Sequence, residues 1–189
     1  MRAHLAMLAA TLVVAGCASM GMGAKGPSAV ANLQPTKGND AKGTVTFSQA
    51  GDVVHVSANI SGLKPNATHG FHVHEKGDCS SDDALSAGGH LNPDGKRHGP
   101  PTGEHHAGDV PSIKADANGV ATVRTRIAGT LLGSGAGDIA GKALVVHVSP
   151  DDYTTQPTGN SGARIACGVI TATPPRDASG QVQPLPERM

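Results

Sequence analysis

The sequence is poor in aromatic residues: it has no tryptophan, one tyrosine and two phenylalanines among 189 residues. A hydrophobic core must therefore be built from Val, Ile, Leu and Ala side chains. The missing tryptophan argues against a true immunoglobulin domain, whose core carries one. By contrast, the chain has ten histidines, and histidine is the commonest metal ligand. The composition therefore points to metal binding.

The chain also lacks an excess of charge of either sign, because 15 Lys and Arg balance 15 Asp and Glu. A neutral chain has no general electrostatic attraction for nucleic acid or anionic lipid. We therefore expect no nucleic-acid partner, and any attraction for an anion must be local. The length suits one ordinary domain with peripheral segments.

The apolar stretch at residues 5–15 is too short to span a bilayer, which takes about 20 apolar residues. Together with Arg2 it is typical of a signal peptide, which we predict over residues 1–16. Residues 14–17 (VAGC) resemble the lipobox of bacterial lipoproteins, in which the cysteine becomes the lipid-modified first residue. We therefore expect Cys17 to anchor a periplasmic protein, through a flexible tether over residues 17–28, to the outer membrane. An ordinary cleavage site with an incidental cysteine is the alternative.

Three cysteines leave one over in a secreted chain. If Cys17 carries lipid, Cys79 and Cys167 remain as a pair in an oxidising compartment, where disulfides persist. A bridge between them would stabilise the fold by roughly 4–5 kcal/mol in the chain-entropy treatment. Two buried, unbridged thiols are the alternative.

Alternating polar and apolar residues predict β-strands along the body of the chain. In residues 52–60 the apolar side chains at 54, 56, 58 and 60 share one face, and His55 lies on the other, exposed face. Further strand segments are predicted at residues 43–47, 120–123, 143–148 and 164–170, and no stretch shows a sustained helical period. Many short strands with Gly- and Pro-rich turns predict a β-sandwich or barrel.

Two histidines two positions apart lie in the segment at residues 70–74 (GFHVH). On a strand, His72 and His74 project to the same side, while Phe71 and Val73 face the opposite side. That spacing alone is a weak signal for a metal. It gains weight because the next 35 residues or so hold further histidines, including those at positions 90, 98 and 106, and because one ends the apolar strand at position 147.

Residues 70–74 (GFHVH), 77–79 (GDC) and 163–170 (ARIACGVI) follow the order found in Cu/Zn superoxide dismutases. The chain from about residue 30 to residue 170 resembles that family. The resemblance implies an all-β, Greek-key β-sandwich or flattened barrel of about eight antiparallel strands, with long metal-binding and active-site loops. We expect this domain over residues 29–172, with a disordered, Pro-rich tail over residues 173–189. Whether it is a monomer or a homodimer stays open.

The resemblance also implies ligands for two metals, copper and zinc. The implied copper ligands are His72, His74, His90 and His147, and the implied zinc ligands are His90, His98, His106 and Asp109. Four imidazole nitrogens suit tetragonal Cu(II), and three nitrogens with one carboxylate suit tetrahedral Zn(II). Asp151 would join a copper histidine to a zinc histidine, with the neighbouring Asp152 as the alternative. His105 is the alternative to His106, and His69 is expected to be structural.

The implied activity is the conversion of superoxide to oxygen and hydrogen peroxide by one-electron cycling of copper, with zinc holding the bridging His90. His90 would also deliver a proton, and Arg164 would pair with the anionic substrate, because a guanidinium is always charged. Thr158 would narrow the channel mouth. A non-catalytic copper-binding module and a copper-only dismutase are the alternatives.

One loop departs from the family pattern. Residues 154–157 (TTQP), between His147 and Arg164, hold no charge where many relatives carry charged residues that attract superoxide. Lys76, Lys96 and Arg97 are the candidates for that role elsewhere. We therefore expect the rate to depend less on ionic strength than in a strongly steered relative.

Overall fold

The computed structural model describes residues 26–174 and residue 181. Cys17, the expected signal peptide and most of the expected tail lie outside these residues. Across the described part of the chain, no helix combines the length and hydropathy needed to cross a membrane.

Eight strands and a single turn of 3-10 helix make up the regular structure of the described residues. The strands are β1 (Ser28–Pro35), β2 (Lys42–Ala50), β3 (Val53–Ser61), β4 (Thr68–His74), β5 (Asp109–Lys114), β6 (Ala121–Ala128), β7 (Ala143–His147) and β8 (Arg164–Thr173), and the 3-10 helix is η1 (Leu85–Ala87).

The alternation in the sequence matches the observed burial. In β3 the side chains at positions 54, 56, 58 and 60 are buried, whereas those at 55, 57 and 59 are exposed. The other predicted segments fall in or overlap β2, β6, β7 and β8. Strand β5 was not predicted, because Pro111 interrupts it; it lies at a sheet edge, where proline is tolerated.

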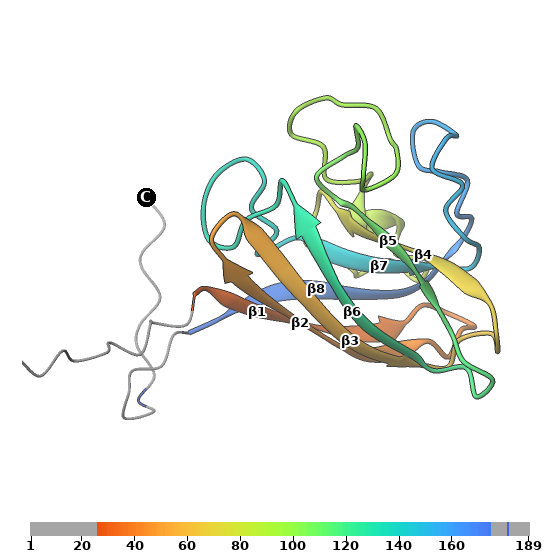
Figure 1. The fold of residues 1–189 in the computed structure, drawn as a ribbon. Coiled ribbons are helices and arrows are strands. Elements are labelled where there is room, and N and C mark those ends of the chain that lie inside the picture. Colours follow the sequence, from red (N-terminus) through yellow and green to blue (C-terminus); the bar gives the residue numbers. More distant parts are fainter. Residues whose placement is uncertain (1–25, 175–180, 182–189) are drawn as a thin grey trace, which may run out of the picture.

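All neighbouring strands pair antiparallel, in the order β5-β4-β7-β8-β1-β2-β3-β6. The edge strands β5 and β6 are consecutive in the chain and contact each other, so the sheet is nearly closed (Figure 1). Strand β8 pairs with β7 on one side and with β1 on the other, and so connects the two halves of the sheet. The predicted all-β fold of about eight antiparallel strands is confirmed.

The core lies inside this flattened barrel and is aliphatic apart from two rings. Phe47 and Phe71, the two phenylalanines, are 1% and 0% exposed. Strands β4 and β7 are buried on both faces, because one face packs on the core and the other is covered by the loops at residues 75–108 and 148–163. Figure 1 shows these two long loops beside β4 and β7. The candidate site lies under them.

Candidate metal centre

Two groups of buried side chains each bring four ligand atoms within 4.8 Å of one another. The first group is His72, His74, His90 and His147, and the second is His90, His98, His106 and Asp109. His90 belongs to both groups. The structure therefore brings together all seven residues that the sequence analysis assigned to the two metals.

Strand β4 explains the first pair. Phe71 and Val73 point into the core, so His72 and His74 point to the other side, where the loops cover them. His147, at the end of β7, is 4% exposed and lies beside them, with its ring centroid 5.6 Å from that of His74. The other histidines of the two groups come from the loop between β4 and β5.

Hydrogen bonds fix which ring nitrogen each histidine turns to the first group. Nδ1 of His74 donates to the Gly88 carbonyl at 2.9 Å, and Nδ1 of His147 donates to the Gly162 carbonyl at 3.0 Å. Because a carbonyl only accepts, both Nε2 atoms keep a free lone pair, and they lie 3.4 Å apart. His72 Nδ1 and His90 Nε2 are buried without a hydrogen-bond partner in the described chain. Four such nitrogens are the donor set that copper prefers.

Asp109 is the centre of the second group. Its Oδ1 lies 2.8 Å from His90 Nδ1, and its Oδ2 lies 3.0 Å from His98 Nδ1. Within the described residues, the Nδ1 atoms of His98 and His106 are buried without a hydrogen-bond partner, which is the state expected of ring nitrogens arranged for a metal. Three imidazoles and a carboxylate fit zinc.

Asp151 connects the two groups. Its Oδ2 accepts from His72 Nε2 at 2.7 Å and its Oδ1 from His98 Nε2 at 2.9 Å. Asp152 instead accepts from Thr154 and Thr155 within its own loop. The geometry thus gives the connecting position to Asp151 and not to Asp152. Such hydrogen bonds orient ligand rings and fix their tautomers.

Burial controls the protonation of these histidines. It lowers the pKa of His72 to about 4, that of His147 to about 3 and that of His74 to about 2. His98 differs: burial opposes its charge, but Asp109 and Asp151 outweigh burial and raise its pKa to about 9.

The pKa values of the two carboxylates, Asp109 and Asp151, are both lowered. Burial alone would raise the pKa of Asp109, but the hydrogen bond from His90 and the His98 ring nitrogen 3.0 Å from its Oδ2 hold that pKa far below its usual range. Burial likewise opposes ionisation of Asp151, but hydrogen bonds from His72 and His98 lower its pKa well below the usual range. Without metal, the two carboxylates are therefore ionised and the imidazoles of His72, His74 and His147 are neutral near pH 7, which are the forms that bind metals.

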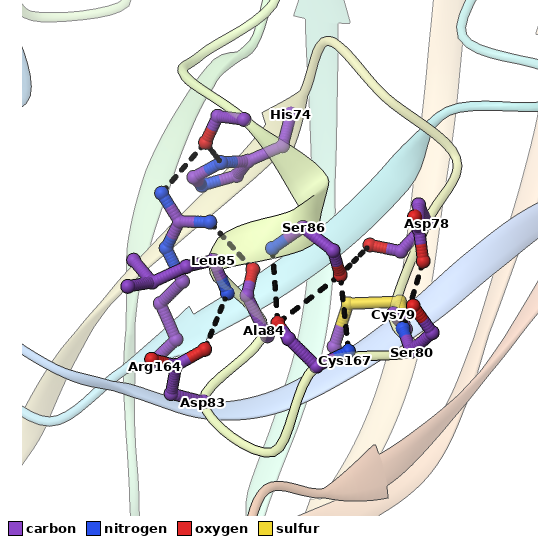
Figure 2. The surroundings of a disulfide bond; sticks show 12 residues. His74, Asp78, Cys79, Ser80, Asp83, Ala84, Leu85, Ser86, Arg164 and Cys167 are labelled. Atoms are coloured by element: carbon purple, nitrogen blue, oxygen red, sulfur yellow. Dashed lines mark hydrogen bonds between the residues drawn. A yellow bond between two sulfur atoms is a disulfide. The ribbon is translucent and has the colours of Figure 1, made fainter.

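A pocket of about 330 Å³ opens beside the first group. Its lining includes His74 and His147 together with Arg164, Thr158 and Asp83. Arg164 donates from Nη1 to the Ala84 carbonyl and from Nη2 to the Gly88 carbonyl, both at 2.6 Å (Figure 2). A fixed cation thus lies in the same pocket as two histidines of the first group.

Cys79 and Cys167, which are 88 positions apart in the sequence, form a disulfide with an S–S distance of 2.03 Å (Figure 2). The predicted pairing is confirmed, and the alternative of unbridged thiols is wrong. The bridge attaches the segment between β4 and His90, which contains Cys79, to β8. Its other cysteine, Cys167, is three residues after Arg164 in β8. In the same loop, Ser86 Oγ donates to the Asp78 carbonyl at 2.9 Å. These contacts hold the segment that carries the acceptors for Arg164.

The other three histidines of the described residues lie outside both groups. His105 Nδ1 donates to the His106 carbonyl at 2.6 Å, and His55 is exposed on the outer face of β3. His69 is buried and donates from Nδ1 to the His147 carbonyl at 2.8 Å, so it supports the backbone of a residue in the first group. The proposed steering residues Lys76, Lys96 and Arg97 are exposed and do not line the pocket.

Sequence reasoning missed Asp83 and Leu85 in the pocket lining, and it missed the Gly88 carbonyl as an acceptor. The Gly-Gly pair before His90 was an available signal, because Gly88 adopts φ 75° and ψ −153°, a conformation open to glycine. The position of Asp83 depends on the loop path and leaves no pattern in the sequence.

Comparison with known proteins gives one family. The sequence model described as copper/zinc superoxide dismutase (SODC) matches residues 41–170. The superoxide dismutase-like protein YojM of Bacillus subtilis (strain 168) is 46% identical over 123 residues, which cover 62% of this chain and 61% of that protein. Superoxide dismutase (Cu-Zn) 2 of Aquifex aeolicus (strain VF5) is 45% identical over 125 residues, covering 62% of this chain and 71% of that protein. The match thus spans less than two thirds of the Bacillus protein.

Two solved structures are similar to this chain over about three quarters of its length. The clock protein EA4 superposes with a TM-score of 0.69 at 40% identity, over 76% of this chain and 93% of that chain. A double mutant of a SOD-like protein from Bacillus subtilis superposes with a TM-score of 0.69 at 39% identity, over 75% of this chain and 96% of that chain.

Proposed function

This chain belongs to the copper/zinc superoxide dismutase family, and on that premise we propose that it is an enzyme that converts superoxide to oxygen and hydrogen peroxide. The family uses copper and zinc, and both ligand groups fit these metals. We assign copper to the group formed by His72, His74, His90 and His147, and zinc to that formed by His90, His98, His106 and Asp109. The observation that carries the proposal is that His90 is common to both groups, with Arg164 in the adjoining pocket.

The reaction defines a role for Arg164 and for His90. Two superoxide anions and two protons give one oxygen and one hydrogen peroxide, so the site needs one-electron chemistry, an anion site and a proton source. Bound copper would supply the electron exchange, since zinc has no redox chemistry. Arg164 would bind and orient superoxide with the donors that Ala84 and Gly88 leave free. His90 Nε2, which is buried and unpartnered within the described chain, is the atom that would hold and return a proton.

The test is metal content measured together with turnover. Purified protein is expected to hold one copper and one zinc per chain and to remove superoxide in a direct assay. An Arg164→Ala variant should keep both metals and lose at least about tenfold in kcat/KM, since a local cation raises anion encounter by 10-fold or more. Full metal content without turnover would instead support a non-catalytic metal-binding module. This outcome is tested because the Bacillus relative is named superoxide dismutase-like.

We further propose that the mature protein is lipidated at Cys17 and held at the outer membrane on the periplasmic side. The support is the lipobox-like segment at residues 14–17 after a short apolar run. The mature protein should carry a diacylglyceryl mass increment and sediment with membranes, whereas Cys17→Ala should be released. An unmodified mature mass would exclude the anchor.

A further inference from the structure

The backbone of His98 is held by a side chain 58 positions further along the sequence. The His98 N–H donates to Gln156 Oε1 at 2.9 Å, and Gln156 Nε2 donates to the His98 carbonyl at 2.8 Å. The amide of Gln156 thus bonds the same two backbone groups that a neighbouring β-strand would pair. A side chain that offers one donor and one acceptor in this arrangement must be a primary amide.

The same loop also holds the ring of His98. Asp151 Oδ1 accepts from His98 Nε2 at 2.9 Å, so residues 151–156 contact His98 at its backbone and at its imidazole. A Cβ on Gly159, whose φ is +65°, would collide with Asp151 Oδ1, which shows how closely this loop wraps the pair. Residues 93–97, which precede His98, are exposed, and the next residue, Gly99, donates from its backbone N–H to Asp109 Oδ2 at 3.3 Å.

Internal hydrogen bonds make the loop a firm support. The Asp152 carboxylate accepts from the N–H groups of Thr154 and Thr155 at 2.9 and 2.8 Å and from the Thr155 hydroxyl at 2.6 Å. Gly159 N–H donates to the Thr155 carbonyl at 2.7 Å. Asp152, Thr154 and Thr155 therefore build a turn that presents Gln156 to His98.

We propose that Gln156 is a positioning residue for His98 and that it slows the release of zinc. The inference rests on the assignment of His98 as a zinc ligand under the proposed function, and not on turnover. For zinc to leave, His98 Nδ1 must separate from His90 and Asp109, and the backbone contacts to Gln156 oppose that movement. Copper does not share His98, so its release is set by other residues.

The experiment follows zinc and copper release from the full-length, copper- and zinc-loaded protein into a chelating dye. Gln156→Ala should release zinc about tenfold faster, at the lower end of the 10- to 100-fold effect typical of residues that hydrogen-bond a metal ligand. Its copper release should stay within about twofold of wild type, because Gln156 is exposed and forms no hydrogen bond to a residue of the first group. Gln156→Asn keeps the amide on a shorter stem and cannot span both groups, so it should fall between.

Thr154→Ala is the matched control. It removes a hydroxyl from the same exposed loop that contacts Asp152 and not His98, and it should release zinc at the wild-type rate. Equal zinc release from wild type and Gln156→Ala would overturn the proposal, and so would an equal acceleration in Thr154→Ala or a parallel loss of copper. A wild-type protein that keeps both metals but lacks turnover would remove the proposed function and leave this measurement intact.

Discussion

His74 and Arg164 donate hydrogen bonds to the same atom, the carbonyl oxygen of Gly88, at 2.9 and 2.6 Å. One peptide group thus orients both a ring of the copper group and the cation in the pocket. Glu75 supports that peptide, because its Oε1 accepts from the Gly89 N–H at 3.1 Å. A disturbance of Gly88 should therefore reach metal binding and substrate binding together.

Gly88→Ala tests this link. Gly88 has φ +75°, and an added Cβ would lie 2.5 Å from Glu75 Oε1. We expect a loss of about 1–3 kcal/mol in the free energy of unfolding, with weaker copper binding and lower turnover. Gly89→Ala is the control, since a Cβ there meets nothing within 4 Å. Urea unfolding and a copper titration measure both effects, and equal behaviour of the two variants would contradict the link.

Asp83→Asn should raise kcat/KM for superoxide by about two- to tenfold. Asp83 lines the pocket and its charge acts on Arg164, so under the proposed function it would repel the anion that Arg164 would attract. The rate of the wild-type protein should accordingly change little with added salt, because the two charges offset each other. Asp82→Asn is the control: Asp82 pairs with Lys37 at 2.8 Å and does not line the pocket. A steep loss of rate between low and physiological salt in the wild type would refute this account.

Asp151→Asn should lower the affinity for both metals by about 10- to 100-fold. The carboxylate accepts from His72 and from His98, whereas an amide has one oxygen and can accept from one of them. Asp152→Asn should have a smaller effect, since Asp152 bonds within its own loop. Competition with a chelator of known affinity measures both metals, and a larger loss in the Asp152 variant would reverse the assignment.

The stability of the metal-free protein should be highest near pH 6.5. Burial lowers the pKa of His72, His74 and His147 from 6.5 to between about 2 and 4. Below pH 6.5 the unfolded chain therefore binds more protons, and the free energy of unfolding falls as the medium is acidified. His98 affects stability above pH 6.5, because its pKa is about 9 in the folded protein and 6.5 in the unfolded chain. The stabilisation that its charge provides is complete below pH 6.5 and is lost as the pH rises toward 9.

Urea unfolding in the presence of a chelator, from pH 4 to pH 9, measures this profile. His98→Gln should remove the decline on the alkaline side and keep the decline on the acid side. A wild-type stability that rises steadily between pH 6.5 and 9 would show that His98 is not charged in the folded protein.

Replacing both bridging cysteines by serine should cost about 4 kcal/mol, because the cross-link spans 88 positions and restricts the unfolded chain. Turnover should fall further than metal affinity, since the bridge supports the segment that carries the Ala84 carbonyl, an acceptor for Arg164. Thermal unfolding, metal titration and a rate assay separate these effects. A double variant with unchanged stability would argue that the loop is held by its other contacts.

Most strands, and the common side of His72 and His74, could be predicted from the local pattern of polar and apolar residues. The period of two in β3 and the apolar run of β7 fixed which faces are buried, and the spacing of His72 and His74 fixed their common side. The assignment of the other ligands came through resemblance, and the structure brings them together. Strand β1 was missed because its sequence (SAVANLQP) has no marked alternation of strongly apolar residues.

The contacts made by the long loops could not be predicted. Gln156 forms hydrogen bonds with His98, 58 positions away in the sequence, and Arg164 donates a hydrogen bond to Ala84, 80 positions away. Such contacts depend on the path of irregular backbone, in which Ala84 has a φ of 58° and Gly88 one of 75°. No period in the sequence encodes these angles, so the supports of the site became visible only in three dimensions.

Strand β8 lies between β7 and β1 and is the last strand of the sheet to leave the ribosome or a translocation channel. Until it arrives, the hydrogen-bonded ladder consists of two unconnected pieces, β5-β4-β7 and β1-β2-β3-β6. The same segment brings Arg164 and Cys167. Barrel closure, thiol oxidation and completion of the pocket beside the first group are thereby deferred to one late step of biosynthesis, so a nascent chain cannot display the finished site before β8 has emerged.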